Sequence, residues 1–148
     1  MTKEQMINAI ESTKKIHLDQ MHTISVALKG SKIDSPPPLF KNECPCGLWF
    51  NQNAQQLKDI LGAQLFEKLD LHHEQWHSEY KKIYDILFKN MKKTGFLSKV
   101  LKKDKIDEMA LDRAKAYYKE LEMSTEAMLR VADAATRRIL ALSDSKFD

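Results

Sequence analysis

Residues 69–87 read LDLHHEQWHSEYKKIYDIL, and their spacing decides the fold class. Apolar and aromatic side chains recur here every three or four residues, which places them on one face of an α-helix. The members of this face are Leu69, His73, Trp76, His77, Tyr80, Ile83, Tyr84 and Leu87. The pattern predicts a long helix over about residues 63–93 that turns His73 and His77 toward a core. His72 falls about 100° away from His73, so we expect it at the surface or beside the site.

The segment before this stretch contains another helix and a loop. Residues 3–29 repeat the helical pattern, with His17 on the apolar face and His22 on the polar face. Residues 31–43 include three consecutive prolines, 36–38, which are excluded from a helix interior. Residues 31–43 are therefore predicted to be a loop, and three of the five histidines of the chain are predicted to point inward.

Two short helices and one further long helix complete the predicted secondary structure. One short helix begins near Cys44, with Asn42 as its N-terminal cap, and the other covers residues 54–61. The last helix runs from about 105 to 142, with Asp104 as its N-terminal cap. Because no strand alternation is visible, the pattern predicts an all-α fold.

Length and composition fit such a fold. The chain has 148 residues, of which 43% are hydrophobic and 30% are charged, as in one globular domain. We predict a four-helix bundle with one or two short extra helices that carry a cysteine ligand. The whole of residues 1–148 is expected to form this single domain, with its motifs between residues 17 and 77.

Charge and hydropathy disfavour several classes of partner. No run of 18 apolar residues is present, and the N-terminus lacks the pattern of a signal peptide, so we expect a cytoplasmic protein without a membrane partner. The net charge of +3 is too small for a long phosphate-binding track, so no nucleic-acid partner is expected. The lysines between Lys89 and Lys105 are interpreted as a solvated corner between helices rather than a docking patch for an acidic partner.

Inward histidines and a nearby cysteine indicate a metal site. The four-residue spacing of His73 and His77 allows two imidazoles on one helix face to reach one ion. His17 adds a third nitrogen, and a cysteine at the start of a short helix feels the positive end of the helix dipole, which favours thiolate. Nitrogen and sulfur donors suit tetrahedral Zn²⁺. A single histidine on an apolar face is more often a hydrogen-bonded core residue, and that reading stays open for each histidine taken alone.

A di-iron carboxylate site and a structural disulfide are both disfavoured. Di-iron carboxylate bundles use Glu-x-x-His on each of two helices, and this chain has one such motif, from Glu74 to His77. A structural disulfide between Cys44 and Cys46 would close almost no loop.

Residues 44–50, CPCGLWF, resemble the Cys-x-Leu-Gly-x-Trp-aromatic signature of the chemoreceptor zinc-binding domain family. In that family a first-helix histidine precedes the cysteine by some tens of residues, and a His-x-x-x-His pair follows it by some tens. His17 and the pair His73 and His77 stand in those places here. The resemblance assigns the cysteine ligand to Cys44 rather than Cys46.

The chain departs from the family pattern at two places. Cys46 stands where the family has leucine. Gln20 and Met21 stand one turn after the first histidine, where the family usually has tryptophan.

The resemblance implies a four-helix bundle with one zinc ion held by His17, Cys44, His73 and His77. It also implies a cytoplasmic sensory domain of bacterial signalling, of the kind attached to chemoreceptors or diguanylate cyclases, that responds to zinc or to oxidants. A homodimer or a signalling partner is expected on the same ground.

Two other functions stay open, and an enzyme is the less favoured one. Four protein ligands saturate tetrahedral zinc, and the chain has no Gly-rich phosphate loop or nucleophile elbow, so we predict no catalysis. An open-site zinc hydrolase would require water in the place of Cys44. The other alternative is a helical interaction protein in which zinc is purely structural.

Overall fold

The computed structural model describes residues 1–89 and 106–147, and the regular structure within these ranges is helical. The long helices are α1 (Lys3–Leu28), α4 (Ala63–Leu87) and α6 (Glu108–Ala141). The short elements are the α-helices α2 (Pro45–Gln52) and α3 (Ala54–Leu61) and the 3₁₀ turns η1 (Lys41–Glu43) and η2 (Asp144–Lys146). The predicted all-α fold is confirmed. No helix in the described ranges has both the length and the apolar character needed to cross a membrane.

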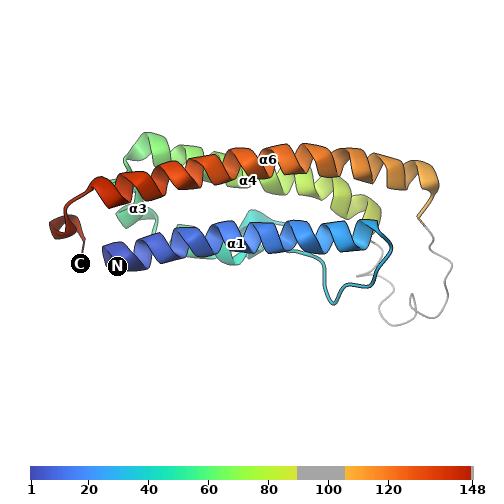
Figure 1. Ribbon diagram of the computed structural model, residues 1–148, viewed down its shortest axis with the longest axis horizontal. Helices are drawn as coiled ribbons and strands as arrows, with labels where there is room; N and C mark the ends of the chain where they lie inside the picture. Colours follow the sequence, from blue (N-terminus) through green and yellow to red (C-terminus); the bar gives the residue numbers. More distant parts are fainter. Residues whose placement is uncertain (90–105, 148) are drawn as a thin grey trace.

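The chain passes along the molecule four times (Figure 1). α1 and α4 run in the same direction, and α6 runs antiparallel to both and packs against both. The return from α1 to α4 is made by an irregular segment followed by η1, α2 and α3. One of the four passes, residues 29–62, is therefore interrupted rather than a single long helix. This segment, called the broken leg below, carries both cysteines.

Local sequence signals explain where the helices start. Thr2 and Gln5 form a reciprocal capping box at the start of α1. The predicted Asn42 cap is wrong, because Cys44 itself is the N-cap of α2. The cause is Pro45, which occupies the first turn of α2, where its missing N–H leaves no helical bond unmade.

The ends of the two longest predicted helices also need correction. α4 ends at Leu87 rather than near residue 93, because the backbone turns at Phe88 and buries that ring beside Tyr84. α6 begins at Glu108 rather than near 105, with Asp107 as the cap that accepts from the Met109 N–H. Asp104 and the lysine cluster after Lys89 lie outside the described residues.

Two apolar clusters form the core, one toward each end of the bundle. One is centred on the aromatic face of α4 and includes Trp76, Tyr80, Tyr84 and Phe88. The other joins the broken leg to α1, α4 and α6 and includes Met6, Phe50, Leu57, Phe66 and Ile139. The inward histidines lie between the two clusters along α1 and α4, so the candidate site is at the middle of the bundle.

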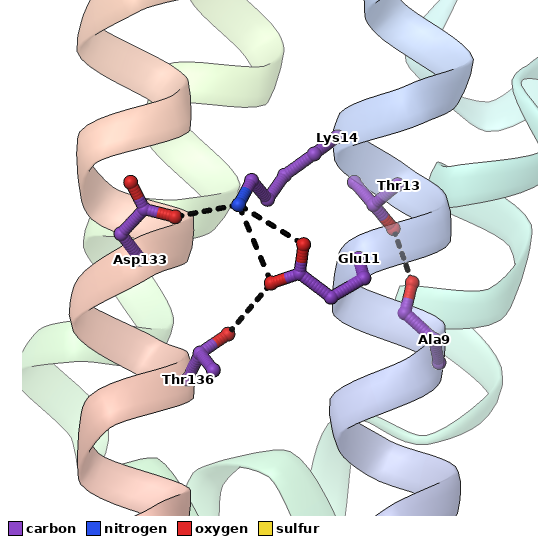
Figure 2. Close-up of polar contacts among 6 residues, drawn as sticks. All are labelled: Ala9, Glu11, Thr13, Lys14, Asp133 and Thr136. Carbon is purple, nitrogen blue, oxygen red and sulfur yellow. Dashed lines mark hydrogen bonds and ion pairs between the residues drawn. The ribbon is translucent and has the colours of Figure 1, made fainter.

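Polar contacts fix α1 against α6 on the outside of the core. Figure 2 shows Lys14 of α1 reaching across to Asp133 of α6, with an Nζ–Oδ1 distance of 2.7 Å. Lys14 also contacts Glu11, whose carboxylate accepts from the Thr136 hydroxyl on α6. At the start of α1, Lys3 donates to the Leu142 carbonyl after α6. These contacts hold α1, and with it His17, in register with the rest of the bundle.

Candidate metal centre

Four buried side chains from three segments converge at the middle of the bundle. His17 comes from α1, Cys44 from the start of α2, and His73 and His77 from α4. Their donor atoms all lie within 4.8 Å of one another. Four donors held ~2.0–2.3 Å from a zinc ion would lie roughly 3.3–3.7 Å apart in a tetrahedron. The group is therefore close to the dimensions of a four-coordinate metal site.

Carbonyl oxygens orient two of the three imidazoles. Nδ1 of His17 lies 2.9 Å from the Thr13 carbonyl, and Nδ1 of His77 lies 3.1 Å from the Leu39 carbonyl. Because a carbonyl oxygen only accepts, each Nδ1 carries the proton and each Nε2 keeps a free lone pair. Both lone pairs face the centre of the group, as metal-ligating histidines require.

The donor atoms of the group lie close to one another in two pairs. Nε2 of His77 lies 3.1 Å from Nε2 of His73, and Nε2 of His17 lies 4.0 Å from Sγ of Cys44. The Cys44 side chain is fully buried, and its residue is the extended N-cap of α2. Its sulfur thus lies at the positive end of a short helix, among nitrogen donors.

Burial keeps the imidazoles neutral. It lowers the pKa of His17 to about 4, an effect that the Thr13 carbonyl opposes and His77 reinforces. Burial also lowers the pKa of His73 to about 2, helped by His17, His77 and Lys41. The pKa of His77 is lowered by burial as well. Neutral imidazoles are the form that binds metal ions, so the group needs no deprotonation of histidine near neutral pH.

The second cysteine has a different environment. Burial raises the pKa of the Cys46 thiol to about 12, although a hydrogen bond with Thr13 acts in the opposite direction. The thiol borders a small cavity of about 30 Å³, which is also lined by Thr13, Trp49 and His73. Cys46 is not a member of the converging group. It is a protonated, inert thiol near neutral pH.

Trp76 forms one wall of the group. Its ring meets the rings of His17 and His77 edge to face, with centroid distances of 4.9 and 5.0 Å. Its indole N–H donates to the Thr125 hydroxyl on α6 at 2.8 Å, and that hydroxyl donates to the Leu121 carbonyl. The buried polar atoms of this wall are therefore satisfied, and the imidazoles are shielded from water on this side.

Lys41 ties the cysteine-bearing segment to α4. Its Nζ lies 2.8 Å from the Asp70 carboxylate and 3.1 Å from the Glu74 carboxylate, one turn apart on α4. The backbone of the same residue packs against Gly47 of α2. A methyl group added at Gly47 would lie 1.9 Å from the Lys41 carbonyl oxygen and 3.3 Å from the His73 ring. Glycine is therefore required where η1 folds back on α2.

The structure brings together the four residues predicted as ligands and separates the others. His22 is exposed, and His72 lies in a shallow surface groove with Lys68 and Arg130, as the helical pattern predicted. Three neighbours of the group, Gln20, Lys41 and Trp76, were not predicted as functional residues. The sequence contains a signal for Gln20 and Trp76, because each lies three residues from an inward histidine and so on the same side of its helix. It contains no such signal for Lys41.

Comparison with known protein families, curated proteins and solved structures finds no significant match for this chain.

Proposed function

We propose that this chain binds one zinc ion through His17, Cys44, His73 and His77, and that it is a regulatory module rather than an enzyme. The observation that carries the proposal is the convergence of four buried donors within 4.8 Å. The Thr13 and Leu39 carbonyls engage Nδ1 of His17 and His77, and the Nε2 atoms are left facing one another and the Cys44 sulfur. Each ring nitrogen of a buried histidine needs a partner, and one shared ion would be a common partner for these Nε2 atoms.

The donor set favours zinc over harder metals. Three imidazole nitrogens and one thiolate are the ligands of tetrahedral Zn²⁺, whereas Mg²⁺ and Ca²⁺ prefer carboxylate and carbonyl oxygens. Nickel and cobalt bind similar donors, so availability contributes to the choice. When bound, the ion supplies a link between three segments of the chain. With four protein donors no position is left for a reacting water, which argues against an open-site hydrolase.

Regulation would arise from the placement of Cys44. The three histidines lie on the long helices, whereas Cys44 lies on the broken leg beside the proline-rich loop. Its thiolate is the donor that oxidation removes, and its segment is the least regular part of residues 1–89 and 106–147. A change at Cys44 would thus be transmitted as a movement of η1 and α2.

The residues that resemble the chemoreceptor zinc-binding domain extend this proposal. By that resemblance the chain would work in bacterial signalling, in response to zinc or to an oxidant, through a homodimer or a signalling partner in the cytoplasm. Sedimentation at micromolar concentration tests the homodimer directly, and a monomer there would remove it from the proposal.

Metal content tests the site. Purified protein analysed by mass spectrometry under native conditions is expected to carry about one zinc ion per chain. Cys44→Ala should lose the ion, whereas Cys46→Ala should keep it. His22→Ala is a matched control for His17→Ala, because both lie on α1 and His22 is exposed. A helical protein without bound metal would mean that the inward histidines are core residues only.

The second candidate is a helical interaction protein with a purely structural zinc ion. The complete burial of Cys44 and His17 favours this reading, because burial slows exchange of a bound ion. Treatment with a mild oxidant separates the two candidates. Loss of zinc together with oxidation of Cys44 supports regulation, whereas a sulfur that stays metal-bound and unmodified supports the structural role.

A further inference from the structure

Gln20 contacts the sulfur of Cys44 from the side of α1. It follows His17 by three residues, and nine-tenths of its surface is buried. Its amide nitrogen Nε2 donates to Sγ of Cys44 over 3.9 Å, a distance suitable for a bond to sulfur. The same sulfur lies 4.0 Å from Nε2 of His17. Two groups of one helix therefore face the thiol from successive turns.

The other end of the Gln20 amide has no partner. Oε1 is the one buried side-chain nitrogen or oxygen in residues 1–89 and 106–147 that lacks a hydrogen bond. An unpaired buried amide oxygen destabilises a fold, and methionine or leucine would fill this space without that loss. Packing therefore does not account for glutamine at position 20. Its role must come from the hydrogen bond that its amide N–H donates.

The N–H end fits a negatively charged sulfur. A thiolate only accepts hydrogen bonds, and an amide N–H is a neutral donor that does not compete for the metal. Such a bond holds Sγ in one direction and withdraws electron density from it. Partners of this kind, one step outside the ligands, commonly change metal affinity by 10–100-fold.

We propose that Gln20 is a positioning residue that holds the Cys44 thiolate against the metal ion and restrains its reaction with electrophiles. The inference rests on the proposed metal site and deepens it, because it names what controls the ligand on which regulation depends. It predicts different effects on the metal-bound and the metal-free protein. Loss of the amide should weaken the metal-bound state and should leave the metal-free state as stable as before, or more stable.

Two variants and one control test the proposal. Gln20→Met keeps the length of the side chain and removes the donor, and Gln20→Glu places a carboxylate beside the sulfur. Tyr118→Phe is the control, because the Tyr118 hydroxyl donates to the Met21 carbonyl of α1 without touching Cys44. All are made in a Cys46→Ala background, so that Cys44 is the only thiol.

Four readouts are compared. Zinc affinity is expected to fall ~10–100-fold in Gln20→Met, and further in Gln20→Glu. Alkylation of Cys44 by iodoacetamide in the zinc-loaded protein should become several-fold faster, because a thiolate without its hydrogen-bond donor is more nucleophilic. In the cobalt-substituted protein the sulfur-to-metal charge-transfer band should move to lower energy. The urea midpoint of metal-free Gln20→Met should equal or exceed that of the parent.

The outcomes separate this inference from the proposed function. Zinc uptake by the parent, with Gln20→Met equal to Tyr118→Phe in affinity and alkylation rate, overturns the role of Gln20 alone. A metal-free Gln20→Met protein that is less stable than the parent assigns Gln20 to packing and also overturns it. A parent that takes up no zinc overturns the metal site and this inference together.

Discussion

Nε2 of His77 lies 3.1 Å from Nε2 of His73, one turn away on the same helix. Nδ1 of His77 is already engaged by the Leu39 carbonyl, so its Nε2 presents a lone pair to the neighbouring ring. Burial holds both imidazoles neutral, which leaves a pair of nitrogen donors poised side by side. Protonation and metal binding compete for these same lone pairs.

The stability of the metal-free protein should depend on pH between about 7 and about 4. Unfolded histidine binds a proton below a pKa of about 6.5, whereas folded His17 resists protonation down to a pKa of about 4. The unfolded chain therefore binds more protons, and the free energy of unfolding falls as pH decreases through this window. His17 alone contributes roughly 3 kcal/mol, lost progressively below about pH 6.5, and His73 adds to it.

Urea unfolding of the metal-free protein at about pH 7 and about pH 5 measures this effect. His17→Gln should reduce the pH dependence of the urea midpoint, whereas exposed His22→Gln should leave it intact. Equal urea midpoints at both pH values would contradict the buried, neutral state of the imidazoles.

Removal of the Lys41 side chain should loosen the cysteine-bearing segment. In Lys41→Met the ion pairs with Asp70 and Glu74 are lost. Because these pairs are partly exposed, we expect the free energy of unfolding to fall by at most about 1 kcal/mol. Zinc release to a chromogenic chelator should nevertheless become several-fold faster. Lys82→Met, which removes one ion pair within α4 and one between α4 and α6 away from the centre, should leave the release rate unchanged.

Addition of one methyl group at position 47 should separate η1 from α2. In Gly47→Ala the new carbon would overlap the Lys41 carbonyl, which is backbone and has little freedom to move. We expect a loss of about 1–3 kcal/mol in the free energy of unfolding and a lower zinc content. Gly30→Ala tests the specificity of this result: Gly30 has φ +81° and open space around it, so its strain should leave zinc content intact. Normal zinc content in Gly47→Ala would show that the segment tolerates the displacement.

Loss of the Thr125 hydroxyl should weaken the wall behind the imidazoles. Thr125→Val leaves the buried Trp76 N–H without an acceptor, which costs about 1–3 kcal/mol. Thr136→Val removes a long, exposed contact from the same helix and should cost less than about 0.5 kcal/mol. Thermal unfolding of the two variants compares these losses. Similar melting temperatures would mean that the Trp76 N–H finds another acceptor.

The histidines of the candidate centre were predictable because helical periodicity reports which side of a helix is buried. His17, His73 and His77 share a face with apolar residues, and the structure buries all three. The short helix α3 was predicted with its observed bounds, since Gly62 gives a clear stop and adopts φ +79°. Periodic helices depend on local sequence, so these features needed no tertiary information.

The broken leg was less predictable because its contacts are not local. Residue type alone predicts Asn42 as a cap, although Pro45 marks the first turn of α2 and so makes Cys44 the N-cap. Lys41 contacts α4 across 29 residues of sequence, a relationship that no spacing rule indicates. The role of Gln20 requires both the direction of its amide and the absence of a partner at Oε1, which depend on the packed side chains.

The broken leg also sets the order in which the bundle assembles. α1, α4 and α6 form from local interactions, whereas Cys44 reaches His17 only after a segment of 27 residues has closed. His73 and His77 should therefore meet as soon as α4 forms, whereas His17 and the sulfur should join them late. Contacts made after the transition state change the rate of unfolding more than the rate of folding. An ion held by all four donors would accordingly lengthen the lifetime of the folded chain while leaving the time it takes to fold nearly unchanged.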